Sequence, residues 1–395
     1  MPEKIFTNIK TEQIAADLSK VVDRVSKQYD HPDIAFQKEA IQNSWDVRED
    51  KHEGKNWVVK IYEYIDENKN PHIVIEDFGT KGMNKEKWRA FSSLWIPKKD
   101  YDNSAGGKGQ GKFVLMNASQ EYILFVESIS DDNGYICKFL RGGEKSNDEE
   151  NLKISDYIPG VKPLTHKGTK IWVYSVQEDF KKSLHSKEFV DSIIECWWQV
   201  LGPRFNGKIY LFDKQIVYQN FPTPEEEVTL FENHQIESFG RIKRLCLGFY
   251  NEKVPYIYDG IRVQRTQMMI IKISFDVRDK DYQGRFSGYI EFEEGLEKEL
   301  NKIERNDHCN FQNQPPWKEI KNLIKDAADK FVSKKVPSKE QRRSINLKNL
   351  SEVISRVNQI INEYCPESVG GGTVVPPIPP KPKPPVGIKH LVVNK

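Results

Sequence analysis

Two carboxylates and one amide occur at helical spacing in the segment QKEAIQNSWDV. Glu39, Asn43 and Asp46 stand at positions i, i+4 and i+7, which places them along one stripe of an α-helix. A carboxylate in such a stripe can polarise a water molecule, and an amide oxygen can ligate a divalent cation. A solvated helix face is the alternative for all three residues, and a helix-capping role is a further alternative for Asp46.

A glycine-rich segment, SAGGKGQGKFVL, follows at residues 104–115. Gly106, Gly111 and Lys112 match the spacing of a phosphate-binding P-loop, but Phe113 stands where that motif needs a hydroxyl for magnesium. The preceding residues are polar and do not form the buried strand that a P-loop follows. Glycines can still surround a polyphosphate with backbone N–H groups, because no Cβ intrudes. The segment therefore predicts a phosphate-binding loop of another class.

Two further segments hold residues of the same kind. EDFGTKGM places Asp77, Gly79 and Gly82 at the end of a predicted strand, and HKGTKIWV places Thr169 on another strand. In this order, the four segments resemble the motifs of the GHKL, or Bergerat-fold, ATPases, the superfamily of gyrase B, MutL, MORC and the heat-shock-ninety chaperones. The resemblance covers residues 1–203. One departure is an extra residue before the second glycine of the usual D-x-G-x-G motif, so either this loop bulges or Gly79 alone makes the close approach.

The resemblance implies a role for each motif residue. Glu39 corresponds to the base that activates water, Asn43 to a ligand of Mg²⁺, and Asp77 to the acceptor for the adenine amino group. Thr169 would hold the water or the carboxylate beside that contact, and Asp46 would support the pocket. The implied cofactors are ATP and Mg²⁺. The ATP-binding residues predicted in this way are Asn43, Asp46, Asp77, Gly79, Gly82, Met83, Gly106, Gly107, Lys108, Gly109, Gln110, Gly111, Lys112 and Thr169.

The helices and strands expected around these residues indicate an α+β fold. Helices are expected at 11–29, 33–48 and 186–201, and strands at 56–64, 72–77, 121–128, 135–140 and 169–176. By resemblance, residues 1–203 form a Bergerat-fold α/β sandwich, with helices on one face of a mixed sheet. Residues 204–336 are predicted to form a transducer-like β-α-β domain, which includes the strand signal KIYLFDKQIVY. Residues 337–366 are predicted to form a C-terminal helical segment. Residues 367–395 are predicted to be a Pro/Gly-rich linker and tail.

The second region supplies candidate contacts to the γ-phosphate. The resemblance implies that a basic residue of the transducer reaches the nucleotide, and Arg262 or Arg265 is the candidate in YDGIRVQRTQMMIIKISFD. For each arginine, a solvent-facing position on a strand is the alternative. His308 and Cys309 lack a partner at metal-ligand spacing and are interpreted as structural. The apolar spacing in residues 346–364 predicts a helix packed on its own domain, with a short coiled coil or dimer arm as the alternative.

The charge, the cysteines and the apolar stretches of the chain indicate its general class and its location in the cell. The chain has 395 residues, a formal net charge of +2 and five widely spaced cysteines without a C-x-x-C pair. The balanced charge does not indicate a nucleic-acid binder, although the local basic runs RIKR and KKVPSKEQRR are candidates for phosphate contact. The cysteines favour reduced thiols, and no apolar stretch has the length of a membrane span. A cytoplasmic protein without a membrane association is therefore expected.

The leading functional hypothesis is an ATP-operated conformational clamp. The ATP-bound chain would form a homodimer that acts on duplex DNA, with a nuclease partner, or both. A loose resemblance of residues 284–311 to prokaryotic MORC-like and MutL-like ATPases implies a restriction or phage-defence setting. A heat-shock-type chaperone that clamps protein clients is the alternative, and a nucleotide-binding scaffold without hydrolysis is a third possibility. A histidine kinase is disfavoured, because the residues before Glu39 offer only His31, which is not on an amphipathic hairpin.

Overall fold

The computed structural model describes residues 11–13, 32–50, 54–92, 111–220, 223–305, 308–337 and 339–364. The chain divides into two units, Met1–Val336 and Pro337–Lys395, and each is described by itself. None of the described helices combines the length and the hydropathy that crossing a bilayer requires.

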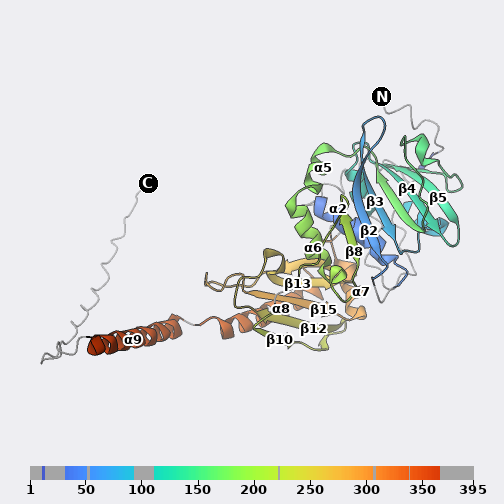
Figure 1. Ribbon diagram of the computed structural model, residues 1–395. Coiled ribbons are helices and arrows are strands. Elements are labelled where there is room, and N and C mark those ends of the chain that lie inside the picture. Colours follow the sequence, from blue (N-terminus) through green and yellow to red (C-terminus); the bar gives the residue numbers. More distant parts are fainter. Residues whose placement is uncertain are drawn as a thin grey trace, which may run out of the picture. The chain divides into compact units, whose positions relative to one another are not determined.

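Nine strands form the first sheet of unit Met1–Val336, in the order β1-β6-β5-β4-β7-β3-β2-β8-β9 (Figure 1). Neighbouring strands are antiparallel except β2 and β8, which are parallel, so the sheet is mixed. The strands are β1 (Thr11–Gln13), β2 (Val58–Ile65), β3 (Pro71–Phe78), β4 (Ile123–Ser130), β5 (Gly134–Arg141), β6 (Glu144–Ser146), β7 (Gly168–Val173), β8 (Lys208–Leu211) and β9 (Lys214–Gln215).

Apolar residues alternate between the two faces of this sheet, as the period of two in a strand requires. Ile73 and Ile75 of β3 belong to the large core under the helices, whereas Val74 belongs to a second cluster on the opposite face. The segment around the short helix η1 (Ile154–Asp156) covers that opposite face with Ile154 and Ile158. The helices of this region are α2 (Pro32–Asp46), α3 (Lys85–Ser92), α4 (Gly111–Asn117), α5 (Glu178–Leu184) and α6 (Lys187–Leu201).

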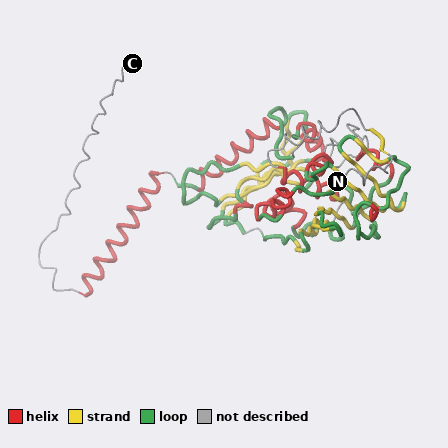
Figure 2. The backbone as a smooth tube through the Cα atoms, turned by 90° about the horizontal axis from the view of Figure 1, so that it is seen from above, coloured by secondary structure: helices red, strands yellow, loops and turns green. Residues whose placement is uncertain are grey.

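A second sheet has the order β10-β12-β15-β13-β14, and β11 pairs with β12. Its strands are β10 (Glu226–Leu230), β11 (His234–Ile236), β12 (Gly240–Phe249), β13 (Gly260–Arg265), β14 (Met268–Ile273) and β15 (Phe286–Phe292). The short helix η2 (Tyr256–Tyr258) precedes β13, and α7 (Glu294–Ile303) and α8 (Trp317–Lys335) pack on β12. Figure 2 shows these strands in yellow beside the red helices.

Helix α6 joins the two sheets into one unit. It packs against α2 and β8 of the first region and against β14 and η2 of the second. Its buried Phe189, Ile193 and Trp197 belong to a single core cluster that also contains Ile75 and Ile290. The two sheets are therefore held by one continuous apolar core.

The α+β class and the mixed sheet expected from the sequence are confirmed. The helix expected at 11–29 is wrong at its start, because Thr11–Gln13 pair as an edge strand with Glu144–Ser146. That pairing joins segments far apart in the chain, so helical periodicity could not indicate it. Residues 14–30 lie outside the described part. The strands β8 and β9, expected in the second region, instead extend the first sheet beyond residue 203.

Unit Pro337–Lys395 contains the helix α9 (Lys339–Tyr364). The expected helix is confirmed, and within its own unit its apolar side chains are exposed. Their exposed fractions run from 46% to 67% over Leu347, Leu350, Val353, Ile354, Val357, Ile360 and Ile361.

Candidate functional site

Asp77, next to the last residue of β3, forms the centre of a buried polar cluster. Its Oδ1 accepts hydrogen bonds from the Thr80 hydroxyl at 2.5 Å and from the Thr169 backbone N–H at 2.8 Å. Thr169 lies on β7, the strand paired with β3. Burial raises the pKa of Asp77 to about 7, although the two hydrogen bonds oppose the rise. Near neutral pH this carboxyl can therefore either accept a hydrogen bond as a carboxylate or donate one as an acid.

Three glycines allow the backbone to approach this cluster closely. Gly79 and Gly82 have φ values of +68° and +64°, which favour glycine. A Cβ at Gly82 would lie 2.1 Å from the Ile129 carbonyl oxygen, and one at Gly168 would lie 2.4 Å from that of Asp77. Gly79 and Gly82 thus both approach neighbouring backbone closely, at Asn56 and at Ile129.

Thr80 and Lys81 fill the space between the two motif glycines, where the usual motif has one residue, and both contact the chain that leaves α2. Thr80 forms a β-bridge with Arg48, and the Glu49 N–H donates to the Gly79 carbonyl at 3.0 Å. The Lys81 N–H donates to the Val47 carbonyl at 2.9 Å. The added residue therefore does not interrupt the loop, because both residues pair with the chain that leaves α2. The sequence reasoning missed Thr80, although its hydroxyl three residues after Asp77 was a usable signal.

Ser128 of β4 is another member that the sequence did not indicate. Its hydroxyl donates to the Gly168 carbonyl and accepts from the Met83 N–H, each at 2.7 Å. It also lies 3.1 Å from the Thr169 hydroxyl. This one side chain fixes the Met83 backbone to the start of β7. A lone serine on a buried strand carries no spacing signal, so only the pairing of β4 with β7 could find it.

Glu39 lies on α2 and is 6% exposed. Its Oε1 is 2.8 Å from Nε2 of His308, a residue 269 positions later in the chain. Its Oε2 lies against Gly111, where a Cβ would be 1.8 Å away. The glycine at the start of α4 therefore leaves room for this carboxylate. Two of the predicted motifs, the α2 carboxylate and the end of the glycine segment, are brought together here.

Asn43 and Asp46 continue the Glu39 stripe toward the end of α2. Asn43 is half-buried and Asp46 is buried. Among the described residues, no group of three His, Cys, Asp or Glu side chains could hold a metal ion. Mg²⁺ bound with a polyphosphate needs only one or two protein ligands, since phosphate oxygens and water supply the rest. A single amide such as Asn43 suits that coordination.

Lys112 is placed differently from a phosphate-binding lysine. Its side chain is 2% exposed, and its ammonium donates to the Phe91 carbonyl at 2.7 Å. Burial lowers its pKa to about 7. In this conformation Lys112 joins α4 to the end of α3, and Phe113 begins the buried run that anchors α4. The other predicted residues of the glycine segment, Gly106, Gly107, Lys108, Gly109 and Gln110, lie outside the described residues.

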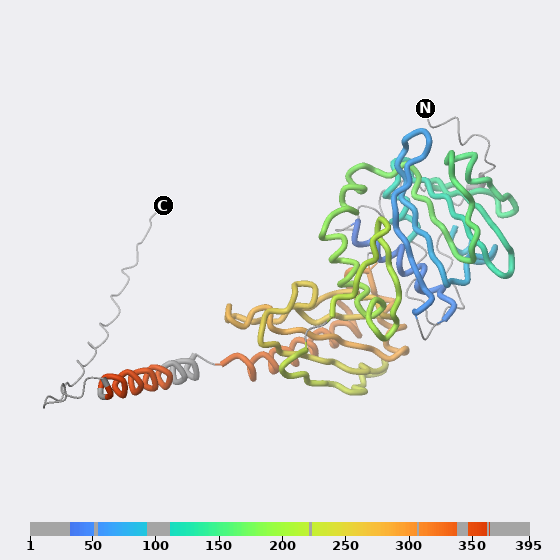
Figure 3. Tube along the Cα trace, viewed as in Figure 1, coloured from blue at the N-terminus to red at the C-terminus, as the bar shows by residue number. Residues whose placement is uncertain are grey.

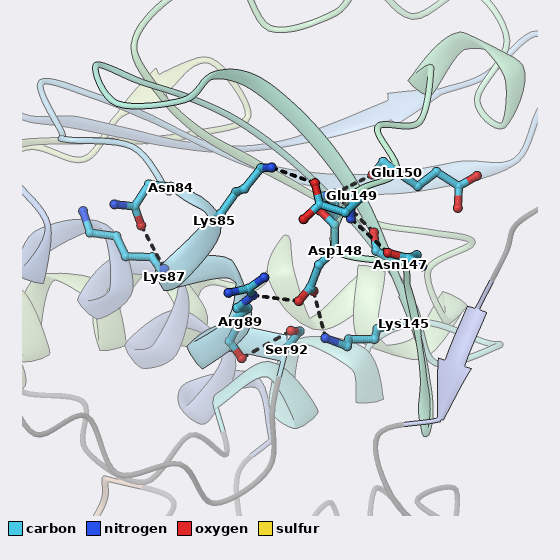
Figure 4. Close-up of polar contacts among 11 residues, drawn as sticks. Asn84, Lys85, Lys87, Arg89, Ser92, Lys145, Asn147, Asp148, Glu149 and Glu150 are labelled. Carbon is cyan, nitrogen blue, oxygen red and sulfur yellow. Dashed lines mark hydrogen bonds and ion pairs between the residues drawn. The ribbon is translucent and has the colours of Figure 1, made fainter.

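Ion pairs hold α3, which follows the Gly82 loop, against the segment after β6 (Figure 4). Lys85 pairs with Glu149 at 2.9 Å, and Arg89 pairs with Asp148 at 2.8 Å. Lys145 reaches the same Asp148 at 2.9 Å. Most of these groups are solvated, so the pairs orient α3 more than they stabilise it.

Comparison with known proteins does not assign the chain to a family. No protein-family model matches the chain, and a search of curated proteins finds no match. The interpretation of the site therefore depends on its own geometry.

The two arginines proposed from the sequence have different surroundings. Arg262 donates to the Ser287 hydroxyl at 3.0 Å and to the Gly288 carbonyl at 3.2 Å, and stacks over Trp198. Arg265 pairs with Glu304 at 2.5 Å. Only the second of these arrangements leads toward Glu39, because Glu304 also contacts His308. His308, interpreted from the sequence as structural, is thus part of the surroundings of Glu39.

Proposed function

We propose that the chain is a Mg²⁺-dependent ATPase of the GHKL class, in which the region around the first sheet has the Bergerat fold. One observation carries the proposal: four segments, selected by residue type, meet at two junctions. Asp77 accepts the Thr169 N–H, and Glu39 lies against Gly111. Both contacts place residues that were selected by their chemistry beside one another, which supports a shared site.

Asp77 is the proposed recognition group for adenine. A buried carboxyl beside a threonine hydroxyl can accept the exocyclic amino group, and Thr80 and Thr169 already orient one of its oxygens. The close backbone approaches at Gly82 and Gly168 make a cradle in which a Cβ would have no room. This arrangement suits a flat base held at the ends of β3 and β7.

Glu39 is the proposed base and Asn43 the proposed ligand of Mg²⁺. A bound Mg²⁺ ion offsets negative charge on the transferred phosphoryl group. The protein's part is to hold the Glu39 carboxylate where it can accept a proton from water. Its burial on α2 and its contact with the first residue of α4 support this role, because α4 begins where the predicted phosphate-binding segment ends.

The proposed function is tested by ATP binding and turnover in wild type, Glu39→Gln and a control, Glu86→Gln. Glu86 is an exposed glutamate of α3. We expect Glu39→Gln to bind Mg·ATP as tightly as the wild type and to lose about 100-fold or more in kcat. The control should match the wild type in both. Wild-type turnover by Glu39→Gln would refute the assignment of the base, and failure of the wild type to bind ATP would refute the whole proposal.

The proposed clamp closes on duplex DNA when two ATP-bound copies associate. The basic run RIKR supplies exposed Arg241 and Lys243, and Glu291 lies 3.8 Å from Lys243 and 3.0 Å from Arg244. Two exposed cations can contribute to phosphate binding but do not make a strong site alone. Salt-sensitive stimulation of turnover by duplex DNA is expected. Suppression of client-protein aggregation without such stimulation would favour a chaperone instead.

A further inference from the structure

A buried row of four charged side chains connects the second sheet to Glu39. Arg265, the last residue of β13, pairs with Glu304 at 2.5 Å. Glu304 also bonds Nδ1 of His308, and Nε2 of His308 lies 2.8 Å from Glu39. Figure 3 shows the backbone of α2 in blue and of the chain after α7 in orange, and the contact of Glu39 with His308 joins these two segments. The row leads from the second sheet to the proposed base.

Charges alternate along this row. Each imidazole nitrogen of His308 faces a carboxylate, and both nitrogens can donate only when the ring is protonated. Burial alone would lower the pKa of His308, but Glu304 and Glu39 raise it to about 9. Burial would likewise raise the pKa of Glu304, but Arg265 and His308 lower it to about 2. An imidazolium between two carboxylates, with a guanidinium next to the far carboxylate, gives each of these four charges an opposite neighbour.

The backbone around His308 is fixed on both sides of the contact. The buried Lys38 ammonium, from the residue before Glu39, donates to the His308 carbonyl at 2.6 Å. Glu304 and Phe311 form a β-bridge, and the His308 N–H donates to the Arg305 carbonyl at 3.1 Å. His308 itself has a φ of +52°, an uncommon conformation for a residue other than glycine. The surroundings therefore define where the imidazole points.

We propose that His308 is a positioning residue for Glu39, supplied by the second sheet region to the base on α2. This inference rests on the proposed ATPase function. By holding Oε1, the imidazole fixes the orientation of the carboxylate and leaves Oε2 on the side of Gly111, where the glycine segment ends. The imidazole of His308 contacts Glu39 directly, so its removal should lower turnover more than adenine recognition at Asp77.

Two near-isosteric substitutions separate this role from a structural one. The amide nitrogen of Gln at 308 can occupy the place of Nε2 and keep a donor toward Glu39. The amide nitrogen of Asn can occupy the place of Nδ1 and keep the donor toward Glu304 alone. We expect His308→Asn to lower kcat by about 10- to 100-fold with an unchanged affinity for Mg·ATP, and His308→Gln to retain most of kcat. His185→Asn, at an exposed histidine, is the control.

Kinetics and ATP affinity are measured on the full chain, after Tm confirms that each variant is folded. Equal loss in the Asn and Gln variants, or wild-type kcat in His308→Asn, would overturn the positioning role while Glu39→Gln still established the ATPase. A wild type without ATP turnover would overturn both proposals. If His308→Asn does not fold, Glu304→Gln replaces it in the test, because this substitution weakens the partner on the other side of the imidazole. We expect Glu304→Gln to lower kcat at unchanged ATP affinity. A wild-type kcat in Glu304→Gln would overturn the inference.

Discussion

Asp77 combines a proposed role in binding with an electrostatic cost to the folded state. Its folded pKa of about 7 lies above the ordinary value of 3.8 because the group is buried. The folded state therefore binds this proton more tightly than the unfolded chain does. The free energy of unfolding falls as the pH rises from 3.8 through 7, and it stays lower above that range.

Asp77→Asn removes the ionisation while keeping the size of the side chain. We expect the variant to exceed the wild type in Tm by about 2 °C at pH 8, with a difference that shrinks toward pH 5. Its affinity for ATP should fall about 10-fold or more, because the exchange disturbs the acceptor of the adenine amino group. Thermal unfolding at both pH values and a nucleotide titration check these outcomes. A Tm difference that does not change with pH would contradict the burial argument.

Gly82 and Gly134 offer a matched test of the close backbone approach. Their φ values are +64° and +61°, but a Cβ at Gly82 would lie 2.1 Å from the Ile129 carbonyl oxygen, whereas nothing lies within 4 Å at Gly134. Gly134→Ala should cost about 1 kcal/mol for its conformation alone. Gly82→Ala should cost about 3 kcal/mol or more, because backbone must move. Urea unfolding measures both, and equal costs would contradict the assigned contact.

At the scale of elements, α2 has the most connections to the proposed site. Its Glu39 faces α4 and the chain after α7, and the residues that follow it pair with the Asp77 loop. Trp45 also donates to Gln267 at 3.3 Å, from the turn between β13 and β14. A shift of this one helix would therefore change the surroundings of the proposed base and of the loop that follows Asp77 together.

Helix α9 carries an apolar stripe suited to the proposed homodimer. Leu347, Leu350, Ile354, Val357 and Ile361 alternate at spacings of three and four, the pattern of a coiled-coil seam. Ile354→Lys should shift the chain toward monomer about 10-fold or more, because a charge would enter the seam. Glu352→Lys, outside the stripe, is the control. Molar mass over a concentration series checks this, and an unchanged mass would exclude α9 from self-association.

At the scale of the whole molecule, the two sheets of Met1–Val336 share one core through α6. Proteins with one continuous core unfold cooperatively, whereas independently cored domains can unfold in separate steps. Residues 1–336 alone should therefore show a single calorimetric transition, at a Tm close to that of the same unit in the full chain. Two resolved transitions would contradict the shared core.

Local patterns in the sequence predicted the geometry around the motif residues. Helical spacing placed Glu39 and Asn43 on one stripe, and strand periodicity predicted β3 and β7, because both patterns depend only on neighbours in the chain. The order of the four motif segments along the chain could also be read from the sequence. Local patterns do not define which elements pair, so the edge strand β1 and the extension of the sheet by β8 were missed.

The side chains around the proposed base come from elements that are far apart in the sequence, and tertiary packing brings them together. The contact of His308 with Glu39 spans 269 positions, and no spacing rule connects residues that far apart. Burial of Lys112 against Phe91 depends on how α3 and α4 pack, although its sequence position suggested phosphate. Contacts of this kind arise because packing brings together side chains from separate elements, and the charges and hydrogen-bond partners of each group follow from that packing.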